Sequence, residues 1–172
     1  MPNLNLNGRF RELVQDMVKE LIKDPNQVRL VMRWNENDNL LWEYRSLAKD
    51  QTRVPGGGSA HAEEIMIVDW PIFIAANNNQ QPLIIEIFLS MSPCIDRSPE
   101  RTILDRDFPA GCANKLASII SNIPGADWRI CFFNYYQEGT RTEPQVYTAP
   151  AILNAASGNV DAHLFKDRGY TL

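Results

Sequence analysis

The chain has 172 residues, a length that suits one ordinary domain, and its 44% hydrophobic and 22% charged residues lie near the average for globular proteins. These values exclude a disordered chain, a collagen and a coiled coil, and three cysteines are too few for a disulfide framework. The formal net charge of −4 argues against a protein that coats nucleic acid through bulk electrostatics.

The longest apolar stretches fall far short of the roughly 20 residues that a membrane-spanning helix needs, so we expect no membrane partner. The first residues lack the basic start and the apolar core of a secretory signal peptide. We therefore expect a soluble monomer with a cytoplasmic site of action.

The first part of the chain predicts a helix and a hairpin. Apolar residues recur at steps of three and four from Phe10 onward, and this amphipathic pattern ends near Lys23. Residues 28–34 and 39–45 are rich in β-branched and aromatic side chains and are joined by a turn sequence, so they predict two antiparallel strands.

A glycine-rich loop leads to the next predicted elements. Residues 48–60 contain a Pro-Gly-Gly-Gly sequence and connect to a helix that begins near His61 and reaches about Trp70, where Pro71 ends or kinks it. Residues 83–90 form a nearly continuous apolar run, which is typical of a strand buried on both faces.

After residue 94, two segments have the pattern of a helix or a strand, and the segments around them are weakly patterned. Residues 95–111 are polar and of mixed charge, residues 112–122 have the apolar spacing of a helix, and residues 128–136 predict another strand. From about residue 137 the tail is weakly patterned, although residues 149–156 favour a helix.

The order of these elements is helix, strand, strand, helix, strand, helix, strand. It predicts a single three-layer α/β domain over residues 1–172, because helices between strands cover the two faces of a central sheet. We expect a mixed sheet of about five strands flanked by helices.

Residue types that bind metals occur where the predicted elements begin or end. His61 opens a helix, Cys94 follows the central strand in a Pro-Cys pair, and Cys112 opens the next helix. One imidazole and two thiolates suit a tetrahedral zinc that keeps its fourth position for water, and helix N-termini favour thiolates. We therefore predict that these three residues bind zinc.

Glu63 is the predicted catalytic residue. It would act as a proton shuttle beside a water molecule whose pKa is lowered to about 7 by zinc.

Simpler interpretations of the same residues remain open. His61 could be a structural histidine and the two cysteines packed free thiols. A purely structural zinc would need a fourth protein ligand, for which Cys131 is the obvious residue, although its place in a strand favours a small buried hydrophobe. His163 lies in the weakly patterned tail and is expected at the surface.

The His-x-Glu helix start, the Pro-Cys pair and the later cysteine resemble the signature of the cytidine deaminase superfamily. The resemblance covers the element order over residues 10–136 and implies a cytidine deaminase-like fold. Ser92-Pro93-Cys94 is similar to the strand end of AID/APOBEC-like polynucleotide deaminases. Seventeen residues, 95–111, separate Cys94 from Cys112, far more than in the family, and we expect an insertion that loops out so that the cysteines still meet.

The resemblance also implies residues that bind the substrate. Ser92 lies against the pocket at the end of the central strand, where a neighbouring amide would face the base. Tyr135 and Tyr136 follow the last predicted strand, where tyrosine rings can stack on bases, and ordinary sheet packing is the alternative. Arg53 lies beside the glycine-rich loop and could bind a phosphate, or it could belong to a solvated face.

Other basic residues give a weaker signal. Arg45 and Lys49 lead into the same loop and could also bind phosphates. Arg97, Arg101 and Arg106 are interleaved with acidic residues in the insertion, so internal ion pairing is expected there instead of a phosphate-binding track.

The resemblance implies a zinc-dependent hydrolase that deaminates cytosine to uracil in single-stranded DNA or RNA, because an unpaired base avoids the energy of leaving a duplex. The chain also resembles bacterial polymorphic-toxin deaminases in its compactness. If it is a toxin, an immunity protein is the expected partner. Residues 61–94 carry four acids and no Lys or Arg, which favours a free nucleoside, nucleotide or other small base instead. A non-catalytic binding module with a structural zinc is the third interpretation.

Overall fold

The computed structural model describes residues 3–24, 28–47, 53–55, 60–134 and 147–172. Its elements, in chain order, are α1 (Gly8–Lys23), β1 (Arg29–Trp34), β2 (Leu41–Arg45), α2 (Ala62–Val68), α3 (Trp70–Ala76), β3 (Ile84–Met91), β4 (Arg101–Ile103), β5 (Arg106–Phe108), α4 (Cys112–Asn122), β6 (Asp127–Asn134), α5 (Thr148–Ala155), β7 (Val160–Leu164) and a short 3₁₀ helix (Phe165–Asp167). None of the helices in these ranges is long and apolar enough to cross a membrane.

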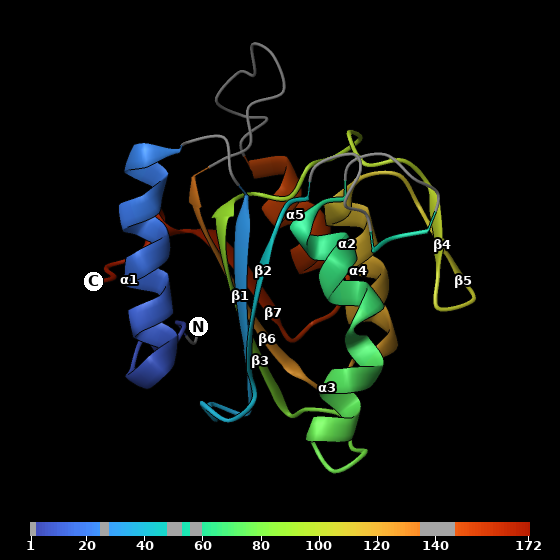
Figure 1. Ribbon diagram of the computed structural model, residues 1–172, viewed down its shortest axis with the longest axis horizontal. Helices are drawn as coiled ribbons and strands as arrows, with labels where there is room; N and C mark the ends of the chain where they lie inside the picture. The colour runs from blue at the N-terminus through green and yellow to red at the C-terminus, as the bar shows by residue number, and fades with distance from the viewer. Residues whose placement is uncertain (1–2, 25–27, 48–52, 56–59, 135–146) are drawn as a thin grey trace.

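Five strands form a mixed central sheet in the order β2-β1-β3-β6-β7. β1 is antiparallel to both of its neighbours, whereas β3, β6 and β7 run parallel to one another. Figure 1 shows α1 on one face of the sheet, where the chain after β7 also packs, and α2, α3, α4 and α5 on the other. The predicted three-layer α/β fold with a mixed sheet is therefore confirmed.

α2 and α3 replace the single helix expected from His61 onward. Asp69 ends α2 and immediately precedes α3, and Pro71 lies in the first turn of α3. Proline is tolerated there because the first backbone N–H groups of a helix have no acceptor within it. The break at Asp69 confirms the predicted kink and packs the Trp70 ring against Trp34 in the core, with their centroids 5.3 Å apart.

The insertion between the two cysteines folds into a hairpin formed by β4 and β5, on the same side of the sheet as α4 (Figure 1). Its two turn residues, Leu104 and Asp105, have φ angles of 54° and 57°. Positive φ at both positions is the geometry of a tight hairpin turn whose twist matches that of the strands. The insertion is thus an ordered element with its own hydrogen-bonded strands.

Two arginines of this hairpin contact the neighbouring helices. Arg101 forms an ion pair with Glu64 of α2, and Arg106 donates to the carbonyl of Ser118 in α4 at 2.9 Å. Arg101 is thus ion-paired, but with an acid outside the insertion, and the partner of Arg106 in this contact is a serine and not one of the interleaved acids, so the expected pairing within the insertion is not what these two contacts show. Their side chains hold the hairpin to the two helices that begin at the candidate metal site.

The C-terminal part of the chain supplies a strand that the sequence pattern did not predict. β7 pairs in parallel with β6 along its whole length and completes the sheet. His163 in this strand is only 6% exposed, so the expectation of a surface histidine is wrong. Its ring nitrogens contact Asp161 and Tyr170, and these contacts compensate the cost of burying polar groups. Because its buried residues include polar ones, the strand lacks the apolar alternation by which a strand is predicted.

The cluster around His163 makes the stability of the protein depend on pH. Nδ1 lies 3.3 Å from the Asp161 carboxylate and Nε2 lies 2.6 Å from the Tyr170 hydroxyl, and burial lowers the pKa of His163. The unfolded chain takes up this proton at about pH 6.5 and the folded chain only at lower pH, so the free energy of unfolding should fall below about pH 6.5. In His163→Asn this part of the pH dependence should disappear from urea denaturation curves recorded near pH 7.5 and pH 5.5. An identical pH dependence in both proteins would contradict this expectation.

Candidate metal centre

His61, Cys94 and Cys112 meet at the carboxyl end of β3. His61 is the N-cap of α2, Cys94 lies three residues beyond β3, and Cys112 is the first residue of α4. Their ligand atoms all lie within 4.8 Å of one another. The structure thus brings together the three predicted metal ligands, because helix starts and strand ends gather at one edge of an α/β sheet.

The insertion leaves and returns at the same point of the structure. The Cys112 backbone N–H donates to the Cys94 sulfur at 3.3 Å, and the Ala113 N–H donates to the Cys94 carbonyl at 2.9 Å. The first turn of α4 is therefore bonded directly to the residue at which the insertion starts. The expectation that the insertion loops out while the cysteines still meet is confirmed.

The donor atoms fit a zinc ion in kind and in separation. A thiolate sulfur and an imidazole nitrogen bound to tetrahedral zinc, at about 2.3 and 2.05 Å, lie about 3.6 Å apart. The Cys94 sulfur and His61 Nδ1 are 3.6 Å apart. Within the described ranges the group holds these three donors, so a fourth position would stay open for a small molecule.

The two thiols differ in protonation. Hydrogen bonds from the Cys112 thiol, and after it from the His61 ring, lower the pKa of Cys94 to about 4 despite burial. Burial raises the pKa of Cys112, and its bond to Cys94 raises it further. The hydrogen bond to Cys94 also raises the pKa of His61. These shifts favour the thiolate form of Cys94 and the thiol form of Cys112, and a thiol that binds a metal as a thiolate releases its proton.

Glu63 is the second residue of α2, two positions after the N-cap His61, and is 2% exposed. Burial, followed by the charge of Cys94, raises the pKa of the Glu63 carboxyl to about 7. Its Oε2 atom is buried and has no hydrogen-bond partner among the described residues. A buried carboxyl with an unbonded oxygen and a pKa near neutrality has the properties of a group that accepts and donates a proton.

Glu64 belongs to the site and was missed by the sequence analysis. It is fully buried, and its Oε1 accepts a hydrogen bond from the His61 backbone N–H at 3.1 Å. Its other oxygen contacts Arg101. The signal was present in the spacing, because a glutamate three residues after an N-cap commonly returns to the N-cap N–H.

The predicted substrate-binding residues have different outcomes. The backbone N–H of Ser92 donates to the Asn134 carbonyl at 2.8 Å, so this amide is used within the sheet. Arg53 forms an ion pair with Asp69 while half of its side chain stays exposed. Tyr135 and Tyr136 lie outside the described residues. The substrate roles of Ser92, of Arg53 and of the two tyrosines stay predictions.

Cys131 lies away from the candidate metal centre. It is buried in β6 and packs with Val14 and Phe88 under α1, on the face of the sheet opposite α2 and α4. In the described part of the chain it is no member of the ligand group. The interpretation of Cys131 as the fourth ligand of a structural zinc is therefore wrong. Its interpretation as a small buried hydrophobic residue is confirmed.

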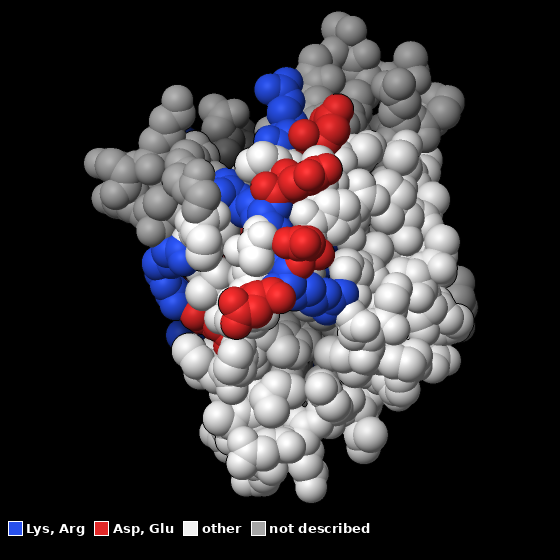
Figure 2. All heavy atoms as spheres, turned by 90° about the vertical axis from the view of Figure 1, so that its right-hand side faces the viewer, with Lys and Arg blue, Asp and Glu red and all other residues white. Residues whose placement is uncertain are grey.

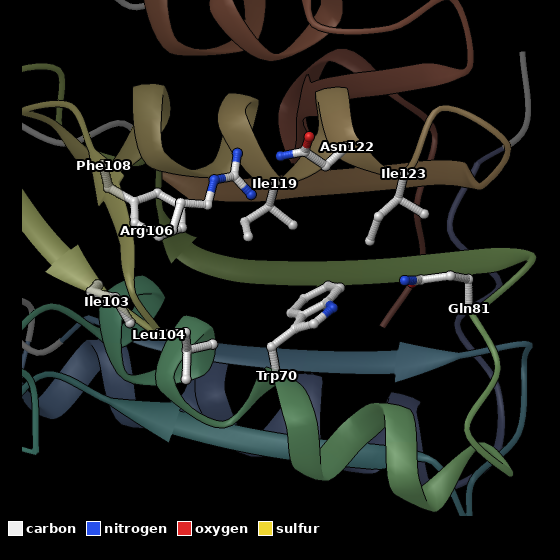
Figure 3. A pocket seen from close by; sticks show the side chains of 9 residues that line it. All are labelled: Trp70, Gln81, Ile103, Leu104, Arg106, Phe108, Ile119, Asn122 and Ile123. Carbon is white, nitrogen blue, oxygen red and sulfur yellow. The ribbon is translucent and has the colours of Figure 1, made fainter.

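A separate hollow of about 210 Å³ lies between the hairpin, α3 and the end of α4. Figure 3 shows Ile119 and Ile123 on one side of it and Trp70 on the other. Its lining side chains are Trp70, Gln81, Ile103, Leu104, Arg106, Phe108, Ile119, Asn122 and Ile123. None of the three metal ligands lines this hollow, so it is distinct from the candidate metal centre.

Comparisons with known proteins leave the site to be interpreted from its own geometry. No protein-family model matches the chain, and no curated protein matches it. The functional interpretation therefore rests on the three converging donors and on the buried carboxyl of Glu63, two residues after His61 in the sequence.

Proposed function

We propose that this protein is a zinc-dependent deaminase that hydrolyses the amino group of a base, cytosine, to give uracil and ammonia. The observation that supports this proposal is the convergence of His61, Cys94 and Cys112 within 4.8 Å, next to the buried carboxyl of Glu63. Three donors with an open fourth position are typical of catalytic zinc, whereas structural zinc takes four protein ligands.

Each residue has a definite task in this reaction. When bound, zinc supplies Lewis-acid activation of water at neutral pH. His61 and the two cysteines hold the ion. Glu63 takes a proton from the attacking water and delivers it to the departing amine, so that water adds at the amino-bearing carbon and ammonia leaves. A pKa near 7 suits a carboxyl that must both accept and donate within one turnover.

We propose single-stranded DNA or RNA as the substrate, on the basis of the Ser92-Pro93-Cys94 resemblance to polynucleotide deaminases. An unpaired base enters a buried site without the few kcal/mol that flipping from a duplex costs. A single strand would need exposed basic side chains to bind its phosphates. Tyr135 and Tyr136, which the resemblance places beside the pocket, lie outside the described ranges.

A free nucleoside or nucleotide is the second candidate substrate, because two of the basic residues predicted to bind phosphates have acidic partners. Arg53 is paired with Asp69, and Arg45 lies 3.6 Å from Glu20. Figure 2 shows Lys and Arg side chains interspersed with Asp and Glu on the face that carries the hairpin. Mixed charges on that face provide no continuous track for a phosphate backbone.

Metal analysis followed by sequencing of treated nucleic acids tests the proposal. The purified chain should contain about one zinc ion, and cytosines in single-stranded DNA or RNA, or cytidine itself, should be converted to uracil. Cys94→Ala should lose both the zinc and the conversion, and Cys131→Ala, which changes a cysteine outside the site, should keep both. A wild-type chain without zinc, or with zinc but without conversion of any of these substrates, would overturn the proposal.

Salt dependence separates the two candidate substrates. Binding of a single strand should weaken steeply as salt rises, with a slope of about −0.7 in log K against log salt for each phosphate neutralised. Affinity for cytidine should hardly change, because no counterions are released. Titrations with a cytosine-containing oligonucleotide and with cytidine between about 50 and 200 mM salt measure this difference.

A further inference from the structure

Arg101 is a buried cation on the insertion hairpin. Its side chain is 3% exposed, although it belongs to a short three-residue strand, β4, at the periphery of the fold. Burial of a guanidinium is costly unless an anion and hydrogen-bond acceptors surround it. The next residue, Thr102, is exposed, so the alternation of the strand directs Arg101 inward.

The contacts of Arg101 reach residues that precede and follow His61 in the chain. It forms an ion pair with Glu64, whose other oxygen accepts the His61 backbone N–H at 3.1 Å. Its Nη1 donates to the Pro55 carbonyl at 3.2 Å, in the segment that precedes His61 in the chain. One guanidinium therefore connects the hairpin to residues on either side of the histidine ligand.

The base of the hairpin is held to the helix that begins with Cys112. The Gly111 N–H donates to the Ser98 carbonyl at 2.8 Å, just before α4. Within α4, the buried ammonium of Lys115 donates to the Ser98 hydroxyl and to the Pro99 carbonyl, the latter at 2.7 Å. The hairpin thus bridges α4 on one side and α2 on the other.

We infer that Arg101 is a positioning residue for the metal centre, acting on His61 through Glu64, an inference that rests on the zinc site of the proposed function. The insertion that separates the two cysteines in sequence then fixes the start of α2 relative to the start of α4, and with it the distance between the histidine ligand and the cysteine ligands. Partners that orient metal ligands from outside the coordination shell commonly contribute 10–100-fold to metal affinity.

Zinc affinity of folded variants tests this inference. Arg101→Met removes the charge and the donors at similar side-chain length, and it should raise the zinc Kd, measured by competition with a chelating dye, by about tenfold or more. It should also shift the visible spectrum of the Co²⁺-substituted protein, which reports ligand geometry at the metal. Thr102→Val is the matched control on the same strand, because it removes only the exposed Thr102–Asp107 hydrogen bond of 2.7 Å. It should leave Kd and spectrum unchanged.

A second variant separates positioning from simple charge compensation. Arg101→Met leaves the Glu64 carboxylate buried without its ion-pair partner and could unfold the chain, whereas Arg101→Met combined with Glu64→Gln leaves no charge uncompensated. A positioning role requires that the zinc Kd of the double variant stays raised at least about fivefold, because the link to the hairpin is still missing.

The outcomes distinguish this inference from the proposed function. A wild-type chain that binds no zinc overturns the metal centre itself. A wild-type chain that binds zinc, together with a double variant of wild-type Kd and an unchanged Co²⁺ spectrum, overturns the role of Arg101 alone. Retained weak binding with an altered spectrum supports it.

Discussion

Glu63→Gln should lower the rate of deamination by a factor of about 10² to 10⁴ and leave the zinc content at about one ion per chain. Glutamine has nearly the same shape as glutamate but neither takes up a proton at neutral pH nor releases one. The Glu63 side chain is 2% exposed and its Oε2 has no hydrogen-bond partner among the described residues, so the change breaks no contact at that atom. Turnover with cytosine in single strands or in cytidine, combined with metal analysis, measures both quantities.

The same substitution at an exposed carboxylate is the control. Glu12 is 62% exposed on α1, on the opposite face of the sheet, and Glu12→Gln should leave turnover unchanged. The thermal unfolding temperature of Glu63→Gln should equal or exceed that of the wild type, because a buried amide needs less desolvation than a carboxylate. Full activity of Glu63→Gln would remove Glu63 from the reaction.

Gly111→Ala should destabilise the fold by more than about 2 kcal/mol and weaken zinc binding with it. Gly111 is the N-cap of α4 and has a φ of 85°, a backbone conformation that alanine adopts with strain. A Cβ atom at this position would overlap the carbonyl oxygen of Ile95. Since Cys112 follows directly, any shift that relieves the overlap moves a predicted metal ligand.

Gly125→Ala is the matched control for that prediction. A Cβ atom at Gly125 would meet no atom within 4 Å, and its φ is not positive. This variant should stay within about 0.5 kcal/mol of the wild type, because surface substitutions away from special backbone positions have small effects. Urea denaturation and zinc competition of the two variants measure the contrast, and equal stability of both would contradict the role assigned to Gly111.

Much of the fold could be predicted from local patterns. The apolar spacing of α1 and α4, the apolar run of β3 and the turn between β1 and β2 each report a single element, and the structure contains all of them. β7 escaped prediction because its sequence alternates around Asp161 and His163, two polar residues whose burial is compensated by contacts with Tyr170, with Arg168 and with each other. A strand whose polar residues find partners elsewhere in the chain carries no hydrophobic signal of its own.

The candidate site likewise has residues that the sequence predicted and residues whose place it could not give. The types of ligand and their places at helix starts and at a strand end predicted a meeting of His61, Cys94 and Cys112, which the structure confirms. The seventeen-residue gap between the cysteines did not prevent it, because both ends of the insertion are hydrogen-bonded at one point. The two tyrosines expected at the substrate lie outside the described residues.

The sequence by itself determined most of the helices, the strands β1, β2, β3 and β6, and the donor atoms available for a metal, because helix periodicity, turn chemistry and thiolate affinity act over a few residues. Only the tertiary structure decided which charges cancel: Arg53 is paired with Asp69, and Arg101 with Glu64. Glu86, an acid within an apolar strand, likewise meets Arg33 of β1 at 2.8 Å. Ion-pair partners far apart in the chain are selected by the folded backbone, because their attraction depends on a distance and a local dielectric that exist only after folding.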